Sequence, residues 1–206
     1  MQDGRSPLSR ERVLAAALGY IDLHGAEALS MRKLGAELGV EAMSLYNHVA
    51  NKDDLLGGVA SLLLELVEVP DPPLPDWRAQ ARLIADNVRA VGLAHPHAFP
   101  LLASRQLSSL DSWAPILAAF DLCRSAGLDD RAAAQAVSAL SSYIVGAVLL
   151  EIGRADLQPV SVEQVPADRQ LLRDYLEGRS GASPELEYRV GIDLLLAGID
   201  AGRVAG

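Results

Sequence analysis

The side chains of this sequence that are best suited to contacting a partner lie between Glu41 and Val49. The helical period places Leu45 and Val49 on one side of this segment and six residues with mostly short or polar side chains on the opposite side. That exposed side comprises Glu41, Ala42, Met43, Ser44, Asn47 and His48. A helix that enters the major groove of DNA needs short or polar side chains to reach base edges. The segment therefore predicts a recognition helix, although a helical hairpin without a DNA role has the same pattern.

A preceding short helix must hold this segment at a steep angle, and residues 30–49 have the spacing of a helix-turn-helix. Ser30 is the predicted N-cap, and Gly35 provides a small residue where the two helices cross. Gly39 provides the left-handed residue of the turn. The apolar anchors that face the first helix are Leu34, Leu38, Val40, Leu45 and Val49.

Helical periodicity continues through the rest of the chain, so the sequence predicts an all-α fold. Ser9 is expected to cap a first helix and Asn51 a fourth. Four prolines between Val69 and Pro75 cannot continue a helix and mark a boundary between domains at 7–67 and 76–206. Further helices are expected at 76–94, 97–104, 109–126, 129–153, 162–178 and 184–202.

About the first 60 residues resemble the DNA-binding domain of the tetracycline-repressor (TetR) family. The resemblance covers the first helix, Gly25, and the strings LSMRKLGAELGV, LYNHV and NKDDLL in the family's order. It implies a homodimeric transcription regulator that a small molecule releases from palindromic operator DNA. In this reading 7–67 is a TetR-type DNA-binding domain, and 76–206 is a helical effector-binding and dimerisation domain.

The resemblance implies base contacts for several positions. Arg32 would reach a base edge or a nearby phosphate, and Ala42, Met43 and Ser44 would face bases. Asn47 stands where the founding repressor has tryptophan, so the operator sequence does not carry over. A solvated charge is the alternative interpretation of Arg32.

The DNA backbone is the implied partner of three further residues. Tyr46 would donate its hydroxyl to a phosphate, and His48 would lie against the backbone. Lys52 would pair with a phosphate, helped by the N-terminus of its helix. Tyr46 as a packing residue and His48 as an exposed spectator remain alternatives.

A pocket between helices is expected after residue 75. The side chains proposed to line it are His95, His97, Phe99, Trp113, Phe120 and Tyr143. Side chains of these kinds are more often part of a core than contacts of a ligand, so a place in the core is the alternative for each of them. His95 and His97 flank a proline and lack the spacing of a helical metal site, so no metal and no cofactor are expected.

The polar groups of the family's tetracycline site are missing from this sequence. A gapless alignment from Trp77 puts Ile84, Val88, Leu102 and Ser142 at the positions where the founding repressor has the polar and histidine ligands of tetracycline and magnesium. We therefore expect a hydrophobic or aromatic effector and not tetracycline.

Dimerisation is expected through the helices near 129–153 and 184–202. Small residues such as Ala139, Ser142 and Gly146 allow close approach, and leucines and isoleucines supply apolar area. Two helices from each subunit would form a four-helix bundle that sets the spacing of the recognition helices.

Composition limits the other classes of function. The net charge of −9 argues against a protein that coats nucleic acid nonspecifically, and the single cysteine excludes an internal disulfide. The polar stretch Met1 to Pro7 predicts no secretory signal, so a cytoplasmic protein is expected. The uncharged stretch from Ala132 to Leu150 approaches the length of a membrane span, but a buried helix in a soluble dimer explains it at least as well. No membrane is therefore expected, and a membrane sensor is one alternative. A helical enzyme is another, but no nucleophile–base pair stands out. The sequence does not separate a repressor from an activator.

Overall fold

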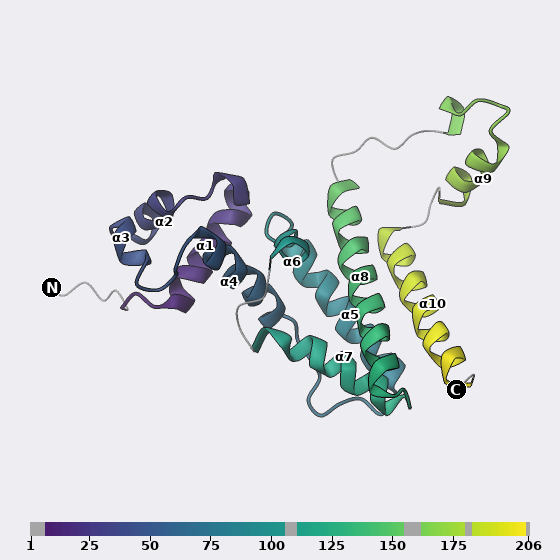
Figure 1. The fold of residues 1–206 in the computed structure, drawn as a ribbon. Coiled ribbons are helices and arrows are strands. Elements are labelled where there is room, and N and C mark those ends of the chain that lie inside the picture. Colours follow the sequence, from purple (N-terminus) through teal and green to yellow (C-terminus); the bar gives the residue numbers. More distant parts are fainter. Residues whose placement is uncertain (1–6, 106–110, 155–161, 180–182, 205–206) are drawn as a thin grey trace.

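The computed structural model describes residues 7–105, 111–154, 162–179 and 183–204, and within these ranges every regular element is a helix (Figure 1). In chain order the elements are α1 (Arg10–His24), η1 (Ala26–Ala28), α2 (Met31–Leu38), α3 (Ala42–Leu45), α4 (Lys52–Glu65), α5 (Trp77–Ala94), α6 (Leu101–Ser104), η2 (Asp111–Trp113), α7 (Ala114–Ser125), α8 (Asp130–Arg154), η3 (Val162–Gln164), α9 (Gln170–Arg179) and α10 (Pro184–Val204). The all-α fold predicted from the sequence is confirmed.

Three polar side chains begin the N-terminal helices. Ser9, Ser30 and Asn51 precede α1, α2 and α4, and each accepts a hydrogen bond from the backbone N–H three residues later. The three donor–acceptor distances are 3.2, 3.3 and 2.9 Å. Each cap satisfies a backbone donor that has no partner inside its helix, which fixes where the helix begins. The predicted caps are confirmed.

Two glycines allow α2 and α3 to cross. Gly39 ends α2 with φ 68° and ψ 34°, in the left-handed region. A Cβ on Gly35 would lie 2.9 Å from the carbonyl oxygen of Val40 and 3.2 Å from the amide nitrogen of Ala42. The backbones therefore approach too closely for any side chain at Gly35, and both predicted glycine roles are confirmed.

The recognition segment is less helical than predicted. The sequence predicts a helix from Glu41 to Val49, whereas α3 spans only Ala42–Leu45. The next three backbone N–H groups, at 46 to 48, donate to the carbonyl three residues earlier. This tighter bonding is common in the last turn of a helix and ends the α-helix early.

Three of the later helices lie where the sequence predicts them, and a proline inside two other predicted helices shortens or divides them. The predicted helices at 76–94, 129–153 and 184–202 correspond to α5, α8 and α10. The helix predicted at 97–104 shortens to α6, which begins after Pro100, and the one predicted at 162–178 divides into η3 and α9 on either side of Pro166. Residues 109 and 110 of the predicted 109–126 helix lie outside the described ranges, and the rest forms η2 and α7.

One hydrophobic core lies among the N-terminal helices α1 to α4, and the C-terminal helices surround a second core. Phe99, Val148 and Leu196 are buried in it, and Tyr188 donates its hydroxyl to the carbonyl oxygen of Ala85 at 2.6 Å. In Figure 1, α8 and α10 run side by side along one edge of the molecule, while α9 lies apart from the other helices. Most of the wall of the cavity described below comes from α5, α7, α8 and α10.

Candidate functional site

The outer side of α3 and the turn after it presents the side chains predicted to contact DNA. Met43 is 73% exposed and Tyr46 is 44% exposed, and Asn47 is exposed as well. Leu45 and Val49 point inward and are buried. The division into an inner apolar side and an outer side is the one that the sequence predicts, even though the helix is shorter. Ala42, Ser44 and His48, the remaining predicted contacts, are half-buried.

Two cations lie on the helices that precede and follow α3. Arg32 is exposed on α2, and Lys52 is the first residue of α4, directly after the Asn51 cap. Neither side chain forms an ion pair or hydrogen bond with another described residue. The first turn of α4 also carries Asp53 and Asp54. Lys52 and Arg32 are therefore available to an anionic partner, and their contacts with DNA remain predictions.

A hydrogen-bond network that was not predicted from the sequence joins α1 to the first turn of α4. The guanidinium of Arg10 holds the carboxylate of Asp54 with two hydrogen bonds, of 2.7 and 3.2 Å. The bond from Arg10 holds the pKa of Asp54 below its usual range, and the same bond raises the pKa of Arg10. The two residues lie 44 positions apart in the chain, so no local pattern indicates the pair.

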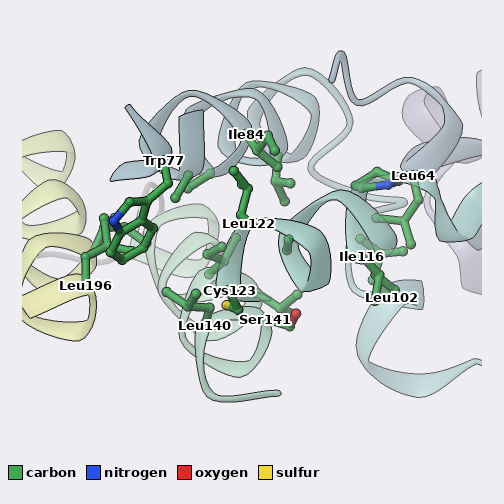
Figure 2. Close-up of a pocket in the computed structure, with 18 residues that line it drawn as sticks. Leu64, Trp77, Ile84, Leu102, Ile116, Leu122, Cys123, Leu140, Ser141 and Leu196 are labelled. Carbon is green, nitrogen blue, oxygen red and sulfur yellow. The ribbon is translucent and has the colours of Figure 1, made fainter. Parts of the chain in front are cut away.

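An apolar cavity of about 210 Å³ lies among the C-terminal helices (Figure 2). Its wall consists of Leu64, Trp77, Ala81, Ile84, Ala85, Val88, Leu102, Pro115, Ile116, Ala119, Leu122, Cys123, Leu140, Ser141, Ile144, Val145, Ile192 and Leu196. Figure 2 shows Trp77 and Leu196 at one end, and Leu64, Leu102 and Ile116 at the other. An engineered cavity of ~150 Å³ is enough to bind benzene, so this space has room for an apolar molecule of at least that size.

The cavity wall has little polarity. None of the eighteen residues that line it is charged, and its polar groups are the Ser141 hydroxyl, the Trp77 indole N–H and the Cys123 thiol. Burial raises the pKa of the Cys123 thiol, which keeps it protonated at neutral pH. An ionised ligand would leave its charge without a partner here, which is costly. The chemistry of the wall therefore fits an uncharged apolar molecule.

The positions aligned with the founding repressor's ligand site match this cavity wall better than the six side chains proposed to line the pocket. Of the four positions aligned with the founding repressor's ligands, Ile84, Val88 and Leu102 line the cavity. Ser142 lies instead in a groove between α8 and α10.

None of the six side chains proposed as pocket lining lies in the wall of this cavity, although Tyr143 lines the groove between α8 and α10, so their contact with an effector stays a prediction. Phe99 is fully buried in the second core, and Trp113 is 43% exposed. Phe120 packs beside Cys123 in a third cluster, and the Tyr143 hydroxyl donates to backbone carbonyls of α10. Most of the cavity wall is instead aliphatic, with an aromatic ring contributed by Trp77.

His95 and His97 contact α1 in the N-terminal part of the chain. The Nδ1 atom of His95 lies 2.8 Å from the carboxylate of Asp22, and Nδ1 of His97 lies 2.9 Å from the carbonyl oxygen of Asp22. Ten residues after His95, the Arg105 guanidinium donates to Asp53 at 2.7 Å. No three potential metal ligands come together anywhere in the described ranges. The two histidines thus serve an interdomain contact.

The segment from His95 to Arg105, here called the bridge, touches both domains along its length. Ala98 and Leu101 are buried in the hydrophobic core formed by the N-terminal helices α1 to α4. Leu102, the next residue, lines the cavity. If Leu102 moves in the cavity wall, its neighbour Leu101, which packs with residues of α1 and α4, is therefore directly affected.

Comparison with known proteins identifies the family. The tetracyclin repressor-like C-terminal domain matches residues 69–202, and the domain of bacterial regulatory proteins of the tetR family matches residues 13–59. The chain therefore belongs to the tetracycline repressor family of bacterial regulatory proteins.

Named relatives and solved structures extend the likeness. The transcriptional repressor DrrR1 of Streptomyces coeruleorubidus is 30% identical over 95% of this chain and 66% of its own length. Apo ActR of Streptomyces coelicolor has a TM-score of 0.87 at 29% identity, covering 98% of this chain and 99% of ActR, and ActR has also been solved with actinorhodin. BioQ with its double-stranded DNA operator has a TM-score of 0.70 at 28% identity, covering 95% of this chain and 99% of BioQ.

The match to curated relatives is partial in length. The chain spans 61% and 66% of the length of the first two of them, DrrR1 being the second. What those proteins do as a whole is therefore carried to this chain only as a proposal.

Proposed function

We propose that this chain is a cytoplasmic transcription repressor, without enzymatic activity, that binds a palindromic operator as a homodimer. The observation that carries the proposal is the outer side of α3, with exposed Met43, Tyr46 and Asn47, together with the cations Arg32 on α2 and Lys52 at the start of α4. Base edges specify and phosphates position, and this surface offers side chains for both. The DNA-bound structure of BioQ and the name of DrrR1 support the same function.

Selection of bound duplexes from a random library tests DNA binding. We expect an enriched palindrome, and we expect Arg32→Ala and Lys52→Ala to weaken binding to it. Lys52→Ala should do so equally for all sequences and flatten the dependence of log K on log salt by about 0.9 for each phosphate that is no longer neutralised. Arg131→Ala, an exposed arginine on α8, is the matched control and should change neither. A library without an enriched palindrome would refute operator binding.

The effector that we propose is an uncharged hydrophobic or aromatic molecule. The uncharged cavity wall supports this class, and the actinorhodin complex of ActR supports ligand binding by a related fold. Because the bridge joins the cavity to the DNA-binding core, a bound molecule that displaces Leu102 also shifts the packing around Leu101. The two recognition segments then lose the spacing that one turn of DNA requires, and the repressor is released.

Two fluorescent probes that differ in charge test the effector class. The neutral N-phenyl-1-naphthylamine should bind and should raise the melting temperature, whereas the sulfonated anilinonaphthalene ANS should bind at least about tenfold more weakly because its charge finds no partner. Ala81→Trp fills the cavity and should abolish binding of the neutral probe. Ala90→Trp is exposed on the same helix and should leave it unchanged. Tighter binding of the sulfonated probe would contradict the proposal.

Dimerisation through α8 and α10 completes the proposal. By length and composition α8 is apolar enough to cross a membrane, with a mean hydropathy of 1.7, and only 17% of that stretch is buried within one chain. On α10, Leu186, Val190 and Leu194 are exposed at four-residue intervals. A second copy that covers both faces removes this apolar area from water and accounts for the composition without a membrane.

A further inference from the structure

The connection between the recognition segment and α4 is held by the side chains of Arg10, from α1, and Asp54, from the first turn of α4. Arg10, the first residue of α1, donates to the carbonyl oxygen of His48 at 2.8 Å. The same guanidinium holds both carboxylate oxygens of Asp54, and Asp54 accepts the backbone N–H of Ala50 at 2.7 Å. Two side chains thus satisfy one backbone acceptor and one backbone donor on either side of Val49.

This connection needs external support because α3 is very short. A helix of four residues has almost no cooperative stability of its own, so tertiary contacts must fix its orientation. Leu45 and Val49 anchor the inner side of α3 because their side chains are buried. This packing holds the helix against the core but does not fix its rotation about its own axis. Directed hydrogen bonds at residues 48 and 50 restrict that rotation.

We infer that Arg10 and Asp54 are positioning residues for operator binding, which orient the segment from Tyr46 to Ala50 without touching DNA. The inference rests on the proposed function, because it concerns how the same surface meets the operator. It also gives Arg10 a role different from that of Arg32 and Lys52, although all three are cations of the DNA-binding domain.

Charge supports this distinction. The hydrogen bond from Arg10 lowers the pKa of Asp54, and the bond to Asp54 raises the pKa of Arg10, so both groups are ionised at neutral pH. The pair has no net charge, whereas Arg32 and Lys52 have no ion-pair partner among the described residues. Releasing Arg10 to a phosphate would leave the half-buried carboxylate of Asp54 facing the polyanion.

The rival role for Arg10 is a direct phosphate contact, and charge-conserving variants separate the two. Lysine keeps the charge but not the planar fork that reaches Asp54 and His48 together. Arg10→Lys should therefore weaken operator binding almost as much as Arg10→Ala if Arg10 positions the segment, and should largely preserve it if Arg10 binds a phosphate.

The experiment uses the full-length chain and the duplex that the wild-type protein selects from a random library, over a range of salt concentrations. We expect Arg10→Lys and Asp54→Asn each to weaken binding by about tenfold, as loss of hydrogen bonds to charged groups implies, with the wild-type salt slope. The double variant should be no weaker than either single variant, because both remove the same network. Melting temperatures above the assay temperature confirm that every variant is folded.

Other outcomes overturn the inference. Tighter binding by Asp54→Asn, or an Arg10→Ala salt slope reduced by about 0.9, identifies Arg10 as a phosphate contact. Wild-type affinity in both variants shows that the network has no role in DNA binding. Arg124→Lys on α7, which alters the exposed pair with Asp130, is the control and should bind as the wild type does. A wild-type protein that selects no duplex refutes the proposed function itself, and the inference with it.

Discussion

At the scale of single residues, two glycines of the DNA-binding domain have opposite surroundings. Gly35 is in contact with backbone, since a Cβ there would lie 2.9 Å from the Val40 carbonyl oxygen, whereas a Cβ on Gly19 meets nothing within 4 Å. Gly35→Ala should lower the free energy of unfolding by about 1–3 kcal/mol because the backbone must shift. Gly19→Ala, inside α1, should raise it by about 0.5–1 kcal/mol. Urea denaturation measures both, and a loss of stability in Gly19→Ala would contradict the geometry.

The only cysteine reports on the cavity. Cys123 lines the wall, and burial raises the pKa of its thiol, so little thiolate is present at pH 7. Modification by a maleimide should be much slower than for a free thiol and should accelerate as the pH rises beyond ~8.5, the usual thiol pKa. N-phenyl-1-naphthylamine should slow it further. Mass spectrometry follows the reaction, with urea-unfolded protein as the fast reference. Equal rates in the folded and unfolded protein would exclude a buried thiol.

These residues show which local features the sequence predicts. The roles of Ser30, Gly35 and Gly39 follow from neighbours within a few positions, and the structure confirms them. The partnership of Arg10 with Asp54 joins residues 44 positions apart, and the cavity wall draws on six helices. Such contacts depend on how helices pack, which composition and periodicity do not determine.

At the scale of elements, the bridge packs against the cores of both domains. The sequence predicts a boundary at the prolines after Val69, but Leu101 from beyond that boundary is buried in the DNA-binding core. Periodicity identifies the long helices α5, α8 and α10 and overestimates α6, because contacts with α1 and a proline shape the residues before it. The bridge is therefore an outcome of packing, and its energetic role is testable.

Leu101→Ala should destabilise both domains together. Leu101 is 6% exposed, and truncating such a leucine costs about 2–5 kcal/mol. Both tryptophans, Trp77 and Trp113, lie in the C-terminal domain, so their fluorescence reports on that domain alone, while circular dichroism reports on the whole chain. At equal protein concentration we expect both signals to shift to the same lower temperature. A fluorescence transition that stays at the wild-type temperature would show that the domains unfold independently.

At the scale of the whole molecule, the net negative charge means that affinity for DNA depends on where a few cations are placed. With a net charge of −9, the protein repels DNA at a distance, and attraction comes only from a few placed cations within about one Debye length, ~8–10 Å. Two such surfaces at a fixed separation bind far more tightly than one. In the proposed dimer the α8–α10 face is thus part of the DNA-binding apparatus, because it sets that separation.

Charges placed on this face should therefore abolish operator binding without touching DNA. Leu150 on α8 is 60% exposed and Leu194 on α10 is 69% exposed, so glutamate at either position is tolerated by the isolated subunit and is buried, unpaired, in the proposed dimer. Leu150→Glu and Leu194→Glu should each halve the mass measured by light scattering and reduce operator affinity by at least about a hundredfold, in line with the loss of a second linked site. Leu117→Glu, 58% exposed on α7, is the matched control and should remain dimeric with full affinity. Dimers in both α8 and α10 variants would place the interface elsewhere, and monomers that keep full affinity would show that one recognition segment is sufficient.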